Sequence, residues 1–249
     1  MHLVKTKTRE LRERASNLME AHKPEEAEMA LHDALQSHPN NLDLMSMLGI
    51  VQTRLDKEEE AESTFRLVLA RDPYHEEAAC SLGRILDNSL RTEEAEMLYR
   101  GVLEKRPDSH CTLDDYCRLL LSEDREDEAL KIARDHVERH PDSVEAHNGL
   151  RYVLAKKEDR LEGMLLAAKP ESALVNELLR TMLEQLETVQ AVFNSVDIKT
   201  ISESTLTDLE EEQIRLRVEI SHLRTQMIEK GHAIDRDLES RINSVPQDS

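Results

Sequence analysis

The sequence predicts an all-α protein built from repeated pairs of helices. Glycine and aromatic residues are scarce, with six glycines, four tyrosines, two phenylalanines and no tryptophan in 249 residues. The rest is rich in Leu, Ala, Glu and Arg, which lose little side-chain freedom in a helix. Two series recur every 34 residues in one phase, and together they indicate a structural repeat: Pro39, Pro73, Pro107 and Pro141, and Ala27, Ala61, Ala95 and Ala129.

The local chemistry around both series predicts where the helices begin and end. Two acidic residues precede each of the four alanines, as Glu59 and Glu60 precede Ala61. Negative charge is favoured in the first turn of a helix, so a second helix of each pair should begin there. Each proline should then follow the end of that helix, because proline cannot continue it.

The motifs within each 34-residue unit resemble the tetratricopeptide repeat family, in which Leu-Gly, Tyr, Ala, Phe and Pro mark a helix-turn-helix unit. The clearest copies contain Leu48-Gly49, Ala61, Phe65 and Pro73, and then Leu82-Gly83, Leu86, Ala95, Tyr99 and Pro107. Weaker copies flank them, with Leu11, Ala15, Leu18, Ala27, Leu31 and Pro39 before, and Leu113, Cys117, Leu120, Ala129, Ala133 and Pro141 after. The resemblance implies an all-α tetratricopeptide-type helical solenoid, although the family's Trp is absent.

The repeat pattern weakens after the fourth copy. A fifth copy begins with Leu150 and Leu154, but Gly163 replaces the alanine and Pro170 comes three residues early. Terminal repeats are usually atypical, so we expect the solenoid to end there. The expected solenoid covers residues 1–168, with repeats at about 8–41, 42–75, 76–109 and 110–143 and a degenerate fifth at 144–168.

The C-terminal third has a different pattern, with apolar residues at alternating steps of three and four. One such stripe predicts an amphipathic helix over residues 171–196, which either covers the last repeat as a lid or forms a coil. After a linker at 197–204, a second stripe predicts a coiled-coil-like helix over 205–243, followed by a frayed tail at 244–249. Its apolar residues either mediate self-association in a homodimer or pack in an intramolecular hairpin: Leu209, Leu216, Ile220, Leu223 and Met227.

Charge and composition restrict the partners and the location. A formal net charge of −19 opposes general binding to nucleic acid or to anionic lipid, because both are polyanions. The first 16 residues lack a signal-peptide core, and no segment has 18 uninterrupted apolar residues, so we expect a cytoplasmic protein without membrane insertion. Three cysteines cannot all pair within one chain, which favours reduced thiols.

The resemblance implies a concave groove lined by the first helix of each repeat. It places these residues in the groove: Arg12, Ser16, Ser46, Ile50, Arg54, Cys80, Arg84, Asn88, Asp114, Arg118, Asn148 and Tyr152. The four arginines would form a positive stripe that can fork onto carboxylates of a partner. The alternative is that they pair with neighbours such as Asp87 and Asp114 and only keep the groove solvated.

Some members of the family bind a peptide's terminal carboxylate with a set of Lys, Asn and Arg side chains on these helices. Ser16 stands where the first Asn of that set would be, and the lysines are missing. This departure argues against binding of a terminal carboxylate and leaves an acidic internal peptide as the expected ligand.

No motif predicts catalysis, a cofactor or a metal site. The sequence has no nucleophile elbow, phosphate-binding loop or metalloprotease signature. His136 and His140 lie one helical turn apart, but no third ligand follows at a recognised spacing, and we interpret them as surface residues at a helix end. Cys80 and Cys111 are interpreted as inert, with oxidation sensing as the alternative if they lie close together and meet solvent.

We therefore expect a non-enzymatic adaptor or scaffold that binds a protein or peptide. The alternative is a structural or regulatory subunit of a larger assembly that uses its outer face and C-terminal helices. A regulatory subunit whose chemistry lies in another chain is a third reading, and fold alone does not choose among them.

Overall fold

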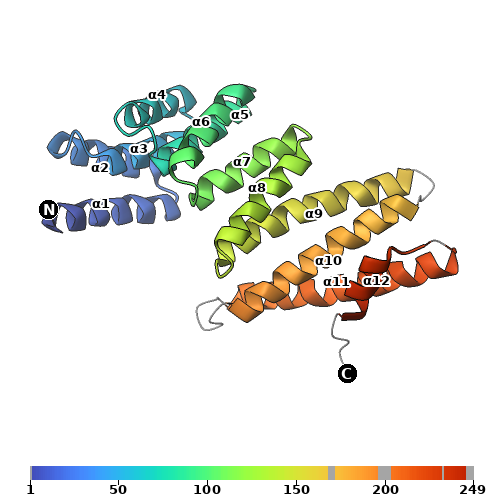
Figure 1. The fold of residues 1–249 in the computed structure, drawn as a ribbon. Helices are drawn as coiled ribbons and strands as arrows, with labels where there is room; N and C mark the ends of the chain where they lie inside the picture. The colour runs from blue at the N-terminus through green and yellow to red at the C-terminus, as the bar shows by residue number, and fades with distance from the viewer. Residues whose placement is uncertain (1, 168–171, 196–202, 232, 245–249) are drawn as a thin grey trace. The chain divides into compact units, whose positions relative to one another are not determined.

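The structure is a computed structural model that describes residues 2–167, 172–195, 203–231 and 233–244. Every regular element in these residues is an α-helix, as the sequence predicted (Figure 1). The chain divides into two compact units, residues 1–119 and 120–249, and the boundary falls inside one helix, α7. The helices are α1 (His2–Glu20), α2 (Pro24–Ser37), α3 (Leu42–Arg54), α4 (Glu58–Leu69), α5 (Glu76–Asn88), α6 (Thr92–Lys105), α7 (His110–Ser122), α8 (Glu126–Arg139), α9 (Val144–Ala167), α10 (Ser172–Ser195), α11 (Glu203–Glu229) and α12 (Arg236–Ser244).

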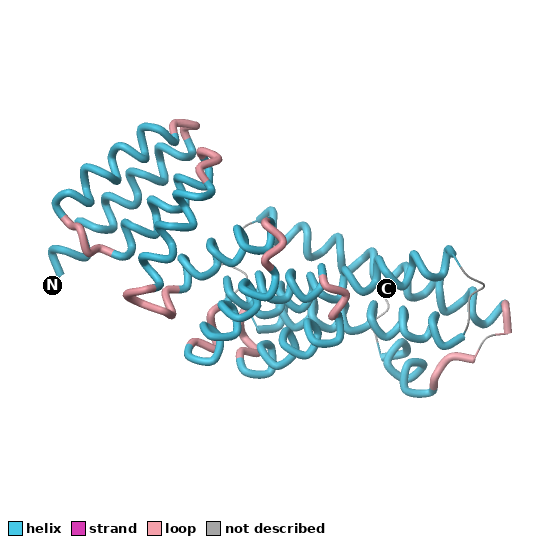
Figure 2. Tube along the Cα trace, turned by 90° about the horizontal axis from the view of Figure 1, so that it is seen from above, coloured by secondary structure: helices cyan, strands magenta, loops and turns pink. Residues whose placement is uncertain are grey.

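The N-terminal unit is a stack of helix pairs joined by short turns (Figure 2). Within a pair, α1 packs on α2, α3 on α4 and α5 on α6, and the first helices α3 and α5 also pack on the helix that precedes them along the chain. The first helices α1, α3 and α5 contact one another in that order. The predicted breaks near the four prolines are confirmed, because each lies between the end of a second helix and the start of the next first helix.

The helix ends repeat in the same 34-residue phase as the prolines. Residues 22, 56, 90 and 124 all have a left-handed backbone, with φ of 57°, 57°, 59° and 57°, between the first and second helices. The residue before α3 caps it, since the Asn41 side chain accepts a hydrogen bond of 3.1 Å from the amide of Leu44. His75 caps α5 in the same way, and Ser143 caps α9. The repeat is thus defined by turn and cap geometry as well as by apolar spacing.

Two small–large pairs bring the helices of the central repeats together. Gly49 faces the buried ring of Phe65, and Gly83 faces the buried ring of Tyr99, 34 residues later in each case. The first repeat keeps the same order of sizes, with buried Ala15 and Leu31 at the equivalent positions. The space between paired helices is therefore filled by one large side chain from the second helix.

Ion pairs on the second helices follow the same period. Lys57, just before α4, contacts Glu28 of α2 at 2.7 Å, and Arg91, just before α6, contacts Glu62 of α4 at 2.8 Å. Glu62 also binds Arg66 at 2.8 Å, and these two cations lower the pKa of its carboxyl. α2 is thereby joined to the start of α4, and α4 to the start of α6.

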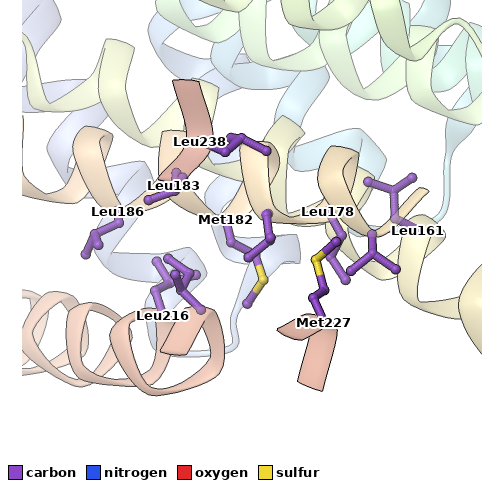
Figure 3. Close-up of a cluster of buried hydrophobic side chains, with 11 residues drawn as sticks. Leu161, Leu178, Met182, Leu183, Leu186, Leu216, Met227 and Leu238 are labelled. Carbon is purple, nitrogen blue, oxygen red and sulfur yellow. The ribbon is translucent and has the colours of Figure 1, made fainter. Parts of the chain in front are cut away.

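The C-terminal unit is a bundle in which α10 is central. It packs against α9, α11 and α12, while α8 packs against α9. Leucines and methionines from α9 to α12 meet in one apolar cluster, which includes Leu161, Leu183, Leu216 and Leu238 (Figure 3). The fifth repeat was expected to contain two helices joined by a turn within 144–168, but α9 is one continuous helix of 24 residues. Its helical partner is α10.

A buried carboxylate lies at the position in α9 where the earlier repeats have a turn. Glu158 occupies the place of the left-handed residues in the earlier repeats, 34 positions after Asp124. Its oxygens accept hydrogen bonds from Gln185 of α10 at 2.6 Å and from Arg215 of α11 at 3.0 Å. These two partners hold residue 158 inside the bundle, within the helix.

The apolar stripe expected to mediate self-association is buried inside the single chain. Four residues of α11 are each at most 3% exposed: Leu209, Leu216, Ile220 and Met227. Leu223, also on α11, is partly buried and packs against the apolar cluster that contains residues of α10. The structure therefore supports the hairpin alternative, and it leaves these side chains unavailable as a dimer seam. A helix surface of this kind carries the same sequence pattern in either arrangement.

The helix expected over 205–243 is two helices in the structure. α11 ends at Glu229 and α12 begins at Arg236. Gly231 has a φ of +70°, a backbone conformation that glycine adopts easily and that ends the first helix. The reversal lets Leu238 of α12 enter the apolar cluster. The linker at 197–204 and the tail at 244–249 fall largely outside the described residues.

Candidate binding surface

The first helices of the N-terminal unit present the residues that the resemblance assigned to a groove. We call the solvent-facing side of α1, α3, α5 and α7 the first-helix surface. It exposes Ser16, Arg54, Arg84, Asn88, Asp114 and Arg118, and it partly exposes Arg12 and Ile50. Ser46 and Cys80 belong to the same register but are buried, so they lie beneath this surface.

Arg12 is held by an ion pair that spans two repeats. Its guanidinium donates a hydrogen bond to Glu77 of α5 at 2.6 Å. The two side chains are each about one-third exposed. Because α3 lies between α1 and α5 in the stack, this pair crosses the helix that carries Ser46. Arg12 is therefore engaged within the unit, as the solvation alternative predicts.

Arg84 and Arg118 share a single buried carboxylate. Arg118 donates to Asp115 at 2.8 Å, and Arg84 approaches the other oxygen at 3.7 Å. Burial raises the pKa of Asp115, while the two arginines act in the opposite direction. The arginines themselves remain 55% and 52% exposed, so each can still present N–H groups to a ligand.

Arg54 differs from the other three arginines. Its side chain is exposed at the end of α3, and no residue that the structure describes forms an ion pair with it. The first-helix surface therefore holds three solvent-facing guanidinium groups on consecutive first helices, at Arg54, Arg84 and Arg118. They are three of the 33 lysines and arginines in a chain whose formal net charge is −19.

A thiol cluster lies beside the Asp115 carboxylate. Ligand atoms of Cys80, Cys111 and Asp115 all lie within 4.8 Å of one another. The Cys80 sulfur is 3.5 Å from the Thr112 hydroxyl, which in turn is 2.8 Å from the Ser109 hydroxyl. Two sulfurs and a carboxylate are donors that a metal ion can use, but Arg84 and Arg118 place positive charge against the carboxylate and oppose a cation there.

The remaining groove residues belong to the C-terminal unit. Asn148 and Tyr152 are exposed on α9, and the Asn148 side-chain oxygen accepts a hydrogen bond of 2.8 Å from Arg151. The interpretation of His136 as a surface residue is wrong, because its side chain is only 4% exposed at the end of α8. His136 lies with its ring centroid 5.0 Å from that of His140, which is partly exposed.

The sequence analysis missed three residues that lie at or beneath this surface: Glu77, Thr112 and Asp115. The arginines were expected to pair with Asp87 and Asp114, but Arg84 and Arg118 both pair with Asp115. A signal was present, because Asp115 lies 34 residues after Ser81 and 68 after Met47, and all three are buried. An acidic residue at a core-facing position needs a cationic partner.

Comparisons with known proteins agree with the repeat architecture. Residues 18–85 match the tetratricopeptide repeat family. No curated protein matches the sequence. None of the described helices is long and apolar enough to cross a membrane.

Similar solved structures include three proteins of low sequence identity. A thermophilic TPR protein of Thermus thermophilus is 13% identical, with a TM-score of 0.52 over 88% of this chain and 99% of that chain. MamA from Desulfovibrio magneticus is 17% identical, with a TM-score of 0.50 over 77% of this chain and 97% of that one. PilF of Pseudomonas aeruginosa is 12% identical, with a TM-score of 0.51 over 87% and 91%. The helix pairs, their 34-residue period and the family match over residues 18–85 together show a tetratricopeptide-type helical solenoid.

Proposed function

We propose that this chain is a non-enzymatic adaptor, located in the cytoplasm, that binds an acidic peptide or an acidic segment of a partner protein on its first-helix surface. In tetratricopeptide proteins this surface lines a concave groove. The observation that carries the proposal is the row of three solvent-facing arginines, Arg54, Arg84 and Arg118, in a strongly acidic chain. A guanidinium can donate two parallel hydrogen bonds to one carboxylate, so a row of them favours an extended acidic ligand.

Arg54 supports the proposal most directly. Arg54 lies in the last turn of α3, where the helix dipole favours a cation, and no described carboxylate neutralises it. Arg84 is engaged only at 3.7 Å by a carboxylate that Arg118 already binds at 2.8 Å. An incoming carboxylate could therefore bind Arg54 and Arg84 without first breaking a short ion pair.

The test uses labelled acidic peptides and matched peptides in which every Glu and Asp is replaced by Gln and Asn. Fluorescence anisotropy with the full chain should detect binding of acidic peptides only, and the affinity should fall as salt rises. Arg54→Glu should weaken binding at least about tenfold, because it removes one charge-assisted contact and adds repulsion. Arg54→Glu with Arg84→Glu should weaken it further.

Arg100→Glu is the matched control. Arg100 is exposed on the second helix α6, and its ion pair with Glu96 is long, at 3.6 Å. This variant makes the same change of charge away from the first-helix surface and should leave the affinity unchanged, with circular dichroism confirming the fold. Equal binding of acidic and amide peptides, or equal loss in Arg100→Glu, would contradict the proposal.

The alternative is a subunit of a larger assembly that uses the outer face and the C-terminal helices. A separate observation favours it: Ile214 and Val218, one turn apart on α11, are 58% and 63% exposed although the chain buries the opposite stripe of that helix. Ile214→Glu with Val218→Glu would then abolish incorporation into the assembly without changing peptide binding.

A further inference from the structure

Two thiols from consecutive first helices lie in one cluster, one beneath the surface and one on it. Cys80 belongs to α5 and Cys111 to α7, and the two sulfurs and an Asp115 oxygen all lie within 4.8 Å of one another. Cys80 is 1% exposed, whereas Cys111 is exposed to solvent. This arrangement supplies an accessible sulfur that can meet a small oxidant and a protected sulfur close enough to react next.

The surroundings shift the pKa values of the two thiols in opposite directions. The pKa of the Cys111 thiol is lowered, chiefly because Cys80 donates a hydrogen bond to it and also through the Arg84 guanidinium, against burial and Asp115. The pKa of the Cys80 thiol is raised by that same interaction and by its burial. The thiolate therefore forms on the exposed sulfur, and a thiolate is the nucleophile toward peroxides.

We propose that Cys80 and Cys111 are a reversible redox pair, in which Cys111 reacts with a hydroperoxide and Cys80 resolves the product into a disulfide between α5 and α7. Cys117 serves as an internal reference. It is 5% exposed, and burial raises the pKa of its thiol to about 12, so it should not react.

The chemistry balances with hydrogen peroxide as the oxidant. The Cys111 thiolate attacks one peroxide oxygen, an S–O bond forms, and the O–O bond breaks. Cys111 becomes a sulfenic acid, and the departing oxygen takes a proton to leave as water. Cys80 then attacks the Cys111 sulfur, an S–S bond forms, the S–O bond breaks, and the Cys80 proton leaves with the hydroxyl as a second water. Two thiols are oxidised and one peroxide is reduced to two waters.

The disulfide would connect the first helices of consecutive repeats beside Arg84. A disulfide bond requires the sulfurs to approach to about 2 Å, so the two side chains must turn toward each other. Thr112 and Ser109 also contact this cluster, and the Cys80–Thr112 contact at 3.5 Å is the one that must loosen. Oxidation would then fix the separation of α5 and α7, which the reduced chain leaves to packing.

The experiment treats the reduced full chain with an equimolar amount of hydrogen peroxide in the presence of a chelator, followed by trypsin and mass spectrometry. Cys80 lies in the tryptic peptide 72–84, and Cys111 and Cys117 both lie in 106–118. The expected product is these two peptides joined with loss of two hydrogen atoms, and a reductant should separate them. The Cys117→Ala variant should give the same product, whereas Cys111→Ser should give none.

The Cys80→Ser variant provides a readout that a structural role would not change. Serine is already present at the corresponding position of the preceding repeat, Ser46, so the variant should fold, with circular dichroism as the check. Without the resolving sulfur, the sulfenic acid on Cys111 should persist, and its labelling by dimedone should rise several-fold over the native chain.

Three results would overturn the proposal. The first is peroxide treatment that yields no joined peptides in the native chain. The second is dimedone labelling that does not increase in Cys80→Ser, or a dimedone label that is attached to Cys117 instead of Cys111. The third is stoichiometric binding of Zn²⁺ by the reduced native chain without chelator, lost in Cys111→Ser, which would assign the cluster to a metal instead.

Discussion

A Cβ atom placed on Gly83 would lie 2.3 Å from Cζ of Tyr99. Real Cβ atoms do not come this close to another carbon, so the glycine at this point of α5 is required by the ring opposite it on α6. Tyr99 is 1% exposed and also packs against Tyr116, with ring centroids 6.2 Å apart, so it cannot easily move aside. The distance between α5 and α6 is thus set by one missing methyl group and one buried ring.

Gly83→Ala should therefore destabilise the N-terminal unit by about 2 kcal/mol, because an added methyl group in a filled core forces side chains off their preferred positions. Thermal unfolding of the full chain measures the loss. Gly101→Ala on α6 is the matched control: nothing lies within 4 Å of its Cβ, so alanine should be neutral or stabilise the helix by up to about 1 kcal/mol. Equal effects of the two substitutions would refute this account.

The same relationship predicts a rescue. The first repeat has Ala15 and Leu31 where the third has Gly83 and Tyr99. Gly83→Ala combined with Tyr99→Leu should lose less stability than the sum of the two single substitutions, because the smaller side chain vacates the space that the methyl group enters. Additive losses would show that the ring does not determine the glycine.

Leu90→Gly should stabilise the protein. Leu90 has a left-handed backbone, with φ of 59°, and its side chain is 89% exposed, so it loses little contact when removed. The left-handed conformation costs a leucine about 1–2 kcal/mol, and the greater freedom of glycine in the unfolded chain offsets part of this. We expect a net gain of about 0.5–1 kcal/mol in thermal unfolding.

Asp56→Gly is the comparison for Leu90→Gly. Asp56 has φ of 57° at the equivalent turn, but aspartate tolerates this conformation better than leucine does. The gain at position 56 should therefore be smaller. A loss of stability at Leu90→Gly would show that the leucine side chain, despite its exposure, contributes contacts that hold the turn.

The repeat boundaries were predictable because every signal for them lies within one unit. Proline, the acidic pair and the small alanine are each read locally, and the shared period confirms each of them in four copies. The pairing of Arg84 and Arg118 was harder to predict. It depends on Asp115 facing inward. The residue type alone does not indicate this, but the equivalent positions of the earlier repeats, Ser81 and Met47, do.

The C-terminal arrangement could not be derived from the sequence for a physical reason. An apolar stripe on a helix predicts burial, but burial by another part of the chain and burial by a second chain satisfy it equally. No proline separates α11 from α12, and the separation depends on Gly231 and on the space that Leu238 finds in the apolar cluster. Tertiary packing therefore determines both how the apolar stripe is buried and where α11 ends.

Leu216→Glu tests the intramolecular assignment of that stripe. Leu216 is fully buried between α11 and α10, so a charged side chain there should cost about 3–5 kcal/mol and open the bundle. Hydrogen exchange should become faster throughout α10 and α11. Ile214→Glu, two residues away and 58% exposed, should change neither exchange nor stability. A dimer that becomes a monomer with unchanged exchange in Leu216→Glu would restore the self-association hypothesis.

Glu62 predicts a pH dependence with a definite sign. Its carboxylate binds Arg66 and Arg91, each at 2.8 Å, and the two arginines lower the pKa of Glu62 below its ordinary value of 4.5. A group whose pKa is lower in the folded chain stabilises that state above the unfolded pKa, and this stabilisation is lost as the pH falls through the folded pKa. At neutral pH, Glu62→Gln should therefore lower the free energy of unfolding by about 1 kcal/mol, the size expected for a partly exposed network of ion pairs. The variant should unfold at a lower temperature than the native chain. The difference should shrink below a pH of about 4.5 and vanish once the native carboxyl is protonated.

Glu59→Gln is the control for Glu62→Gln. Glu59 is an exposed residue of the same helix α4, so its substitution should change stability by only a few tenths of a kcal/mol. If Glu62→Gln costs the same at every pH, the carboxylate acts through packing and not through its charge.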